Sequence, residues 1–248
     1  MPPRLYVDTA LAADLAFVLP PAAARHAQVL RLQPGDALIL FDGRGGEWSS
    51  RIDAMGKRDV RAVVLTHHAI ERELPFAVTI ALAMPSADRM DFVVEKATEL
   101  GVVALVPLLT ERSVLRLASE RAEKRRAHWQ AVAVAACEQC GRNRVPTIHP
   151  VMALATWLAE GQAQIGNDGT RLLLGWRDAV PWTQAMAGLA PSGAELTLLS
   201  GPEGGLSPSE EDLARGRGFA VASLGTRVLR ADTAPLAALA SLALGAGS

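Results

Sequence analysis

The chain has 248 residues, of which 50% are hydrophobic, and its net charge is −1. This length suits one large or two modest domains with a substantial core, so the composition excludes a disordered protein. No apolar run approaches the ~18 residues of a membrane-spanning helix, and no leader-like stretch is evident at the N-terminus, so we expect a cytoplasmic protein. A net charge near zero argues against a general polyanion binder.

Residues 1–72 are predicted to form a small β module. Short runs of strand-forming residues (RLYV, AFVLP, DALILF, EWSSRID, VRAVVL) alternate with turn signals, and the glycines of DGRGG at 42–46 suit a tight reversal. One helix is expected at residues 22–32. The polar segment 71–75 ends in proline and indicates a linker, so the domain boundary is placed between residues 72 and 73.

Residues 73–248 change to alternating strands and helices. Strands are expected at the apolar runs 76–84, 102–109, 172–176, 195–200 and 219–225. Helices are predicted at 88–100, 119–139 and 233–244. Asp88 and Gly101 are expected to cap the first of these helices. Apolar strands separated by helices indicate an α/β fold with a mostly parallel sheet that is covered on both faces.

The sequence GPEGGLSPSE at 201–210 contains a glycine-rich loop. Ser207 and Glu210 have the spacing of a capping box, and Pro208 suits the first helical position, so the glycines lie between a strand end and a helix start. Ligands bind at this place in open parallel sheets. The loop lacks the lysine of a phosphate-binding loop, and Glu203 suits hydroxyl groups, an amine or a positive charge better than phosphate. The alternative is a structural turn in which Glu203 caps a nearby N–H.

A second loop, LGTRVLRADTAP at 224–235, repeats this arrangement. Gly225 lets the chain turn after a strand, and Asp232 or Thr233 can cap the last helix. A third strand end carries Gly175. Backbone groups from three neighbouring loops suit a flat purine beside an apolar pocket. The apolar walls are expected from Leu199, Leu224, Val228 and Leu229, each of which singly also suits an ordinary core.

Cysteine and histidine do not indicate a metal site. Cys137 and Cys140 have the spacing of half a zinc ribbon, but no second pair completes it, so reduced structural thiols are expected. The pair His67 and His68 and the single His149 are not spaced as ligands. We therefore predict no metal.

The motifs GPEGGLSPSE and LGTRVLRADTA resemble the C-terminal signature of the ribosomal RNA small subunit methyltransferase E family, in the SPOUT superfamily. HAQVLRLQPGD, LFDGRGGEW, DRMDFVVEKATELGV, ERSV and CEQCGRNRVP resemble the same family in the same order. Together these segments span most of the chain. One departure is Asp232, where the family commonly has glutamate; the change keeps the carboxylate and shortens its reach.

The resemblance implies an N-terminal PUA-like β-barrel for RNA, a C-terminal SPOUT domain with a deep trefoil knot, and a homodimer. It also implies S-adenosylmethionine as cofactor and methylation of N3 of one uridine in the 16S rRNA of the assembled small ribosomal subunit. The implied cofactor-binding residues are Leu174, Gly175, Leu199, Ser200, Gly201, Pro202, Glu203, Gly204, Gly205, Leu224, Gly225, Val228, Leu229, Arg230 and Thr233.

Two residues are candidates for the chemistry. Arg230 can stabilise the uracil anion, because a guanidinium can face both an oxygen and a nearby phosphate. The alternative for Arg230 is an ion pair with Asp232 or Glu203. Glu138 is the candidate base, with a structural pairing to an arginine as the alternative. The candidate RNA contacts are Arg4, Arg25, His26, Arg31 and Arg44 in the first domain and Arg89, Lys96, Arg112, Arg142 and Arg144 in the second.

Two other functions stay open at this point: a SPOUT enzyme that modifies another base or another RNA, and a non-catalytic RNA-binding relative. The intact glycine loops argue against the non-catalytic relative. A nucleotide hydrolase is disfavoured because the phosphate-binding lysine is missing.

Overall fold

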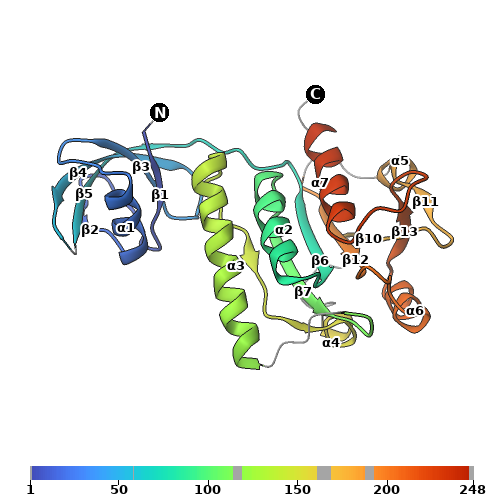
Figure 1. Cartoon of the computed structure of the whole chain (residues 1–248). Coiled ribbons are helices and arrows are strands. Elements are labelled where there is room, and N and C mark those ends of the chain that lie inside the picture. Colours follow the sequence, from blue (N-terminus) through green and yellow to red (C-terminus); the bar gives the residue numbers. More distant parts are fainter. Residues whose placement is uncertain (1, 58, 114–118, 161–168, 188–192, 246–248) are drawn as a thin grey trace. The chain divides into compact units, whose positions relative to one another are not determined.

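The computed structural model describes residues 2–57, 59–113, 119–160, 169–187 and 193–245. The chain forms two compact units (Figure 1). The first consists of residues 1–73 together with 134–145, and the second of residues 74–133 and 146–248. The sequence predicted a single boundary between residues 72 and 73 and did not assign the segment 134–145 to the first unit. The predicted domain boundary stays a prediction.

A five-stranded sheet forms the centre of the first unit. Its strands are β1 (Arg4–Tyr6), β2 (Ala16–Val18), β3 (Ala37–Phe41), β4 (Glu47–Met55) and β5 (Val60–His68), in the order β1-β3-β4-β5-β2. β1 pairs with β3 in parallel and all the other pairs are antiparallel. Alternate residues of β3 and β5, such as Leu38 and Val64, face a core that is completed by the alanines of helix α1 (Pro21–Val29). The predicted β module is thus present.

Helix α1 ends earlier than residue 32 because Arg31 adopts a left-handed conformation, with φ of 56°. The N–H of Leu32 donates to the carbonyl of Ala27 at 3.1 Å, and that of Arg31 donates to the carbonyl of Gln28 at 3.0 Å. These bonds form a Schellman motif, in which the left-handed position is normally glycine. The arginine at this position therefore carries backbone strain.

All strand pairs of the second unit are parallel. The strands are β6 (Ala77–Ala83), β7 (Ala104–Leu109), β8 (Thr147–Ile148), β9 (Met152–Ala153), β10 (Thr170–Leu174), β11 (Val180–Pro181), β12 (Glu195–Ser200) and β13 (Ala220–Ser223). Their order is β11-β13-β10-β12-β6-β7-β8, and β9 also pairs with β7. The predicted α/β class with a parallel sheet is confirmed.

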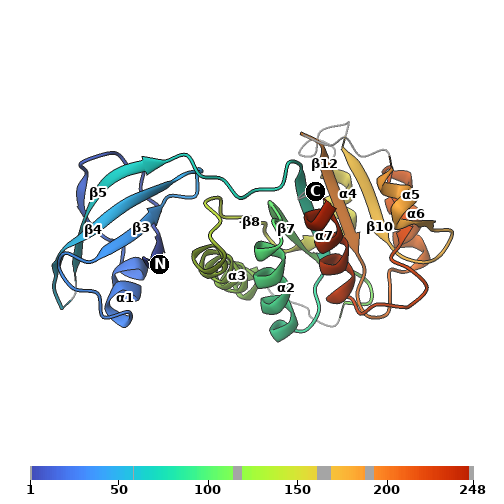
Figure 2. The same ribbon diagram turned by 90° about the horizontal axis from the view of Figure 1, so that it is seen from above.

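Helices cover this sheet on both faces, as a parallel sheet requires. The helices of this unit are α2 (Ala87–Glu99), α4 (Leu154–Glu160), α5 (Trp182–Met186), α6 (Pro208–Gly216), α7 (Thr233–Gly245) and the first part of α3 (Ser119–Cys140), whose residues 134–140 belong to the first unit. Figure 2 shows α2 and α7 on one side of the sheet and α4 and α6 on the other. Trp157 of α4 and Phe219 before β13 pack with their ring centroids 5.9 Å apart on that second side.

Helix α7 returns from the β13 edge to the middle of the sheet. It packs on β12, on β6 and against α2. The chain therefore reverses its direction across the sheet after its last strand. The deep trefoil knot that the family resemblance implies stays a prediction.

The helix ends follow the sequence signals with one exception. Ser207 and Glu210 form the expected capping box at α6, and Gly101 takes the expected left-handed position after α2, with φ of 95°. The prediction that Asp88 caps α2 is wrong: the cap position is Ser86, and Asp88 lies in the first turn. A carboxylate in the first turn still interacts favourably with the helix dipole.

Replacing Arg31 by glycine is expected to raise the free energy of unfolding by about 1 kcal/mol. The change removes roughly 1–2 kcal/mol of left-handed strain, which is partly offset by the greater freedom of glycine in the unfolded chain, worth roughly 0.4–1 kcal/mol. Urea unfolding followed by circular dichroism measures the difference. Arg31→Ala keeps the strain and should give no gain; equal stabilisation by both variants would contradict the prediction.

Candidate active site

A cavity of about 380 Å³ lies in the second unit, where strands β10 and β12 end. Its walls come from the loop after each of these strands, from residues 228–231 and from the start of α6. β10 and β12 are neighbours in parallel register, with Leu174 opposite Ser200, so their carboxyl ends open at one edge of the sheet. This edge is where parallel α/β sheets bind ligands, and the volume falls in the range of small-molecule sites.

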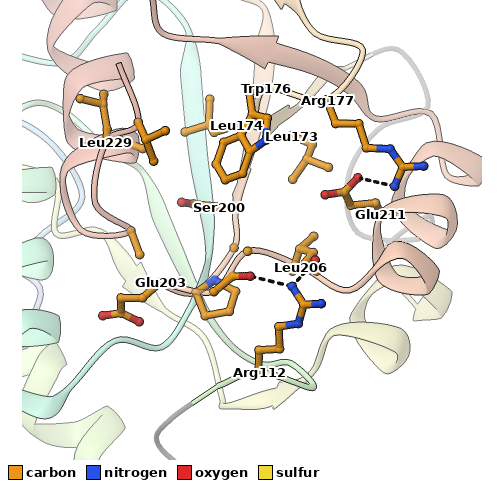
Figure 3. Close-up of a pocket in the computed structure, with 18 of the residues that line it drawn as sticks. Arg112, Leu173, Leu174, Trp176, Arg177, Ser200, Glu203, Leu206, Glu211 and Leu229 are labelled. Carbon is orange, nitrogen blue, oxygen red and sulfur yellow. Dashed lines mark hydrogen bonds and ion pairs between the residues drawn. The ribbon is translucent and has the colours of Figure 1, made fainter. Parts of the chain in front are cut away.

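The glycine-rich loop 201–206 forms the floor of the cavity in Figure 3. A Cβ atom on Gly201 would come within 3.0 Å of the backbone nitrogen of Leu206, and Gly205 has a φ of 68°. The N–H of Gly205 donates to the carbonyl of Pro202 at 2.8 Å, which closes a tight turn. Glycine is needed at these two places because a side chain would clash or strain the backbone.

Arg112 holds this loop from outside. Its Nη1 donates to the carbonyl of Gly204 at 2.7 Å and to that of Leu206 at 3.4 Å (Figure 3). The N–H of the adjacent Glu111 donates to the carboxylate of Glu210 in α6 at 2.9 Å. The turn after β7 is thus bound to both ends of the 204–210 segment. Arg112, predicted as an RNA contact, belongs to the cavity wall in this structure.

The second predicted loop forms the opposite wall. It follows β13, and Gly225 has a φ of 89°. A smaller cavity of about 100 Å³ lies beside this loop and shares Leu174, Trp176 and Val228 with the larger one. Three strand ends therefore meet at one site, as the sequence predicted.

Most of the predicted cofactor-binding residues line these two cavities. The larger cavity is lined by Leu174, Gly175, Ser200, Gly201, Pro202, Glu203, Gly204, Gly205, Val228, Leu229 and Arg230, and Leu224 and Gly225 line the smaller one. Leu199 is a correction: it is fully buried in the core between the sheet and α4, because its side chain points to the face opposite to that of Leu198. Thr233 begins α7 and lines neither cavity.

Several lining residues were not predicted as cofactor contacts. They are Arg112, Leu173, Trp176, Arg177, Leu206, Pro208, Glu211, Val221, Ala231 and Ala234. Trp176 is 70% exposed although it is a large hydrophobic residue. Because β10 ends at Leu174, Gly175 and Trp176 lie in the loop beyond it and not within the strand that we predicted. An exposed tryptophan directly after a strand-end glycine is the signal that could have pointed to this residue.

The charges at the cavity are of both signs. Arg177 Nη1 lies 3.8 Å from the Glu211 carboxylate on one side, and the exposed Glu203 lies across the view in Figure 3. Arg230 is exposed and, within the part of the chain that the structure describes, forms no ion pair. Asp232 instead pairs with Arg89, with 3.0 Å between Nη1 and Oδ2. The alternative in which Arg230 pairs with Asp232 or Glu203 is therefore not realised.

Glu138, the candidate base, lies in the first unit and does not line either cavity. Its carboxylate accepts the N–H of Tyr6 at 2.9 Å and lies 3.0 Å from Nδ1 of His26. Burial raises the pKa of Glu138, although the Tyr6 N–H and His26 act in the opposite direction. The structure thus gives Glu138 and His26 a shared structural contact; their roles in proton transfer and RNA binding stay predictions.

Arg4 and Arg142 are corrections to the predicted RNA contacts. Arg4 lies 2.6 Å from the Glu47 carboxylate and donates to the side-chain oxygen of Asn143 at 2.6 Å. The Nε of Arg142 donates to Glu73 at 3.1 Å, and only 3% of the Arg142 side chain is exposed. Their guanidinium groups bind the segment 134–145 to the rest of the first unit, and burial keeps them from an external phosphate.

Glu47, whose carboxylate accepts a hydrogen bond from Arg4, has a shifted pKa. Burial of Glu47 acts to raise this pKa, but hydrogen bonds from Arg4 and Arg72 outweigh it and the pKa is lowered. Its ionised form is therefore the one that the network stabilises.

The other predicted RNA contacts reach the surface. Arg25, Arg31 and Arg44 are exposed in the first unit. Arg144 is half exposed and lies 3.3 Å from the Glu71 carboxylate. Lys96 pairs with Glu95 and Glu99 of its own helix, which raises its pKa. Their contact with RNA stays a prediction.

Neither a metal cluster nor a membrane span is found in the described ranges. No group of three or more metal-ligating side chains is close enough to hold an ion there. No described helix is both long and apolar enough to cross a bilayer. Both cysteines are unpaired, and burial raises the pKa of Cys137 to about 12.

Two family models match the chain. The RNA methyltransferase domain matches residues 72–243, and the RNA methyltransferase PUA domain matches residues 19–65. The parallel sheet, the glycine-loop cavity and these matches define the class: an RNA methyltransferase with an N-terminal PUA-like domain.

Sequence and structure relatives identify the family within this class of RNA methyltransferases. The ribosomal RNA small subunit methyltransferase E of Synechocystis is 35% identical, over 96% of this chain and 76% of the relative, and that of Bacillus subtilis is 31% identical, over 86% and 84%. The crystal structure of the Neisseria gonorrhoeae enzyme bound to S-adenosyl methionine is 37% identical, covers 98% of this chain and 97% of that one, and has a TM-score of 0.89. A Legionella pneumophila methyltransferase with bound SAM is 31% identical, covers 99% and 98%, and has a TM-score of 0.90. The chain belongs to the ribosomal RNA small subunit methyltransferase E family, so the predicted resemblance is confirmed.

Replacing Arg142 by alanine is expected to lower the free energy of unfolding by about 3 kcal/mol or more, because it leaves the Glu73 carboxylate partly buried without its main partner. Arg25→Ala, at an exposed arginine of the same unit, should change stability by less than about 0.5 kcal/mol. Urea unfolding of both variants measures this contrast. Equal, small effects would mean that the Arg142 pair is not structural.

Proposed function

We propose that the chain is an S-adenosylmethionine-dependent enzyme that methylates N3 of one uridine in the 16S rRNA of the assembled small ribosomal subunit. The observation that carries the proposal is the cavity at the ends of β10 and β12, formed by the motifs that the family shares. Two relatives of 31% and 37% identity carry this cofactor in their solved structures.

The residues of the cavity fit this cofactor. Exposed backbone groups of the glycine loops suit the edge of a purine, and Leu173, Leu174 and Leu229 give an apolar wall for its face. The carboxylates of Glu203 and Glu211 suit an ammonium, a sulfonium or ribose hydroxyls, whereas Arg112 and Arg177 suit a carboxylate. The same carboxylates disfavour a phosphate ligand, which argues further against a nucleotide hydrolase.

The reaction is a displacement in which N3 attacks a methyl carbon and the carbon–sulfur bond breaks. The bound cofactor supplies the electrophilic methyl group. The protein must then hold uracil N3 in line with this carbon and favour loss of the N3 proton. Arg230 is exposed at the cavity wall and unpaired among the described residues, so its guanidinium can stabilise negative charge on a uracil oxygen.

RNA is expected to contact both units. Arg25, Arg31 and Arg44 are exposed in the PUA-like unit and can bind phosphates, which position the RNA without reading its sequence. The strained Arg31 supports this role, because glycine would be better for the fold at that position. Glu138 stays the candidate proton acceptor only by family resemblance, since it lies in the first unit and its carboxylate accepts the N–H of Tyr6. A homodimer and a cytoplasmic location complete the proposal.

Methyl transfer to small ribosomal subunits tests the function directly. Labelled S-adenosylmethionine is incubated with the enzyme and with subunits that lack the modification, and naked 16S rRNA is treated in parallel. Nucleoside mass spectrometry then locates the label. N3-methyluridine from subunits alone is the expected result.

Other outcomes are equally informative. Label in a different nucleoside would favour another SPOUT specificity, and label only in naked RNA would overturn the requirement for an assembled particle. A complete lack of transfer, with cofactor binding intact by calorimetry, would favour a non-catalytic RNA-binding relative.

Replacing Arg230 by alanine is expected to lower kcat by about 10²–10³-fold, the usual effect of losing one donor to a developing anion. The cofactor Kd and the KM for subunits should change little. Steady-state kinetics and calorimetry measure these constants. Arg121→Ala, at an exposed arginine of α3, serves as the control. A higher KM with unchanged kcat would instead identify Arg230 as a phosphate contact.

A further inference from the structure

The loop that carries Arg230 is anchored outside the cavity by one ion pair. Asp232 Oδ2 lies 3.0 Å from Nη1 of Arg89 in α2, with 15% of the Asp232 side chain and 37% of the Arg89 side chain exposed. Arg89 lines neither cavity. A carboxylate that is covered to this degree needs a partner, because an unpaired charge out of water is unfavourable.

Asp232 lies inside the turn that joins Arg230 to helix α7. The carbonyl of Arg230 accepts the N–H groups of Thr233 and Ala234, each at 3.0 Å. The second oxygen of Asp232 accepts the hydroxyl of Thr233 at 3.4 Å. Fixing Asp232 therefore fixes the backbone of Arg230 and of Ala231, both of which line the larger cavity.

The anchor itself rests on two packed helices. Arg89 lies in the first turn of α2, and α2 packs against α7. Met90, next to Arg89, is fully buried. The guanidinium is thus carried by a rigid element, whereas the loop 224–232 contains residues of high exposure such as Val228 at 77%. The pair joins this helix to a loop in which residues 225–228 are exposed to solvent.

We infer that Arg89 is a positioning residue that, through Asp232, holds the Arg230 loop in the wall of the active site. By pairing with the Asp232 carboxylate, Arg89 also keeps this carboxylate from pairing with Arg230. This assignment replaces the interpretation of Arg89 as an RNA contact. Its effect on catalysis rests on the proposed function, whereas its effect on the loop does not.

A double-mutant cycle tests the inference. Arg89→Met keeps the aliphatic stem and Asp232→Asn keeps the shape, and each removes the ion pair. We expect each variant to lower kcat by about ten- to a hundredfold, the effect of a misplaced catalytic group. The KM for subunits and the cofactor Kd should stay within about twofold. The double variant should be no worse than either single variant, since both changes remove the same interaction.

An RNA contact at Arg89 would behave differently. Arg89→Met would raise the KM for subunits, Asp232→Asn would not, and the two effects would multiply in the double variant; this result would overturn the inference. Arg89→Lys keeps the charge and should restore part of kcat. A lysine variant as impaired as Arg89→Met would count against an electrostatic anchor.

Hydrogen exchange of the free protein gives a readout that does not depend on activity. Peptides covering residues 224–232 should exchange faster in Arg89→Met and Asp232→Asn than in the wild type. Glu95→Gln, which removes a surface ion pair of the same helix, should leave this segment unchanged. Unchanged exchange in all three variants would overturn the inference. If the wild type failed to methylate RNA, the proposed function would fall, and the exchange data would still decide whether Arg89 anchors the loop.

Discussion

The parallel pairing of every strand in the second unit is the constraint on which the site depends. Parallel strands point their carboxyl ends to one edge, and most of the connections between them run through helices that lie on the faces of the sheet. β10 lies between β12 and β13, so the loops after these three strands meet although they come from distant parts of the sequence. The helices that cover both faces bury the strands and leave this edge as the open one. The cavity is therefore a consequence of topology, and the glycines allow its loops to fold tightly.

Arginine has three distinct roles in this protein, and burial separates them. Arg4 and Arg142 are covered and bind carboxylates that hold the segment 134–145 in the first unit. Arg112 binds backbone carbonyls and shapes the glycine loop. Arg230 is exposed at the cavity and has no ion-pair partner among the described residues. The same residue type thus supports the fold, shapes the glycine loop or stays open at the cavity, where we propose that Arg230 meets the uracil, according to what surrounds its guanidinium.

Polar contacts also bind the segment 134–145 to residues 1–73 of the first unit. Asn143 is fully buried, donates to the carbonyl of Ile70 at 2.6 Å and accepts from Arg4. Glu138 of the same segment binds the backbone of Tyr6. The family motif CEQCGRNRVP, which contains Glu138 and Asn143, therefore stabilises the PUA-like unit, whether or not it also has a role in catalysis.

The sequence by itself determined the local features. Apolar runs indicated the strands, Ser207 and Glu210 the start of α6, and Gly101 the end of α2. The glycine motifs indicated many of the residues that line the two cavities, because each of these signals depends on neighbours within a few positions. Only the tertiary structure decided which charged residues are covered and which long-range pairs form. Arg142 and Arg25 look alike in the sequence, yet one is buried against Glu73. Arg89 meets Asp232 across 143 positions, and Trp176 and Val221 reach the cavity only because strand order brings β10 and β13 together. Burial and strand order arise from the packing of the whole chain, and no local pattern of residues encodes them.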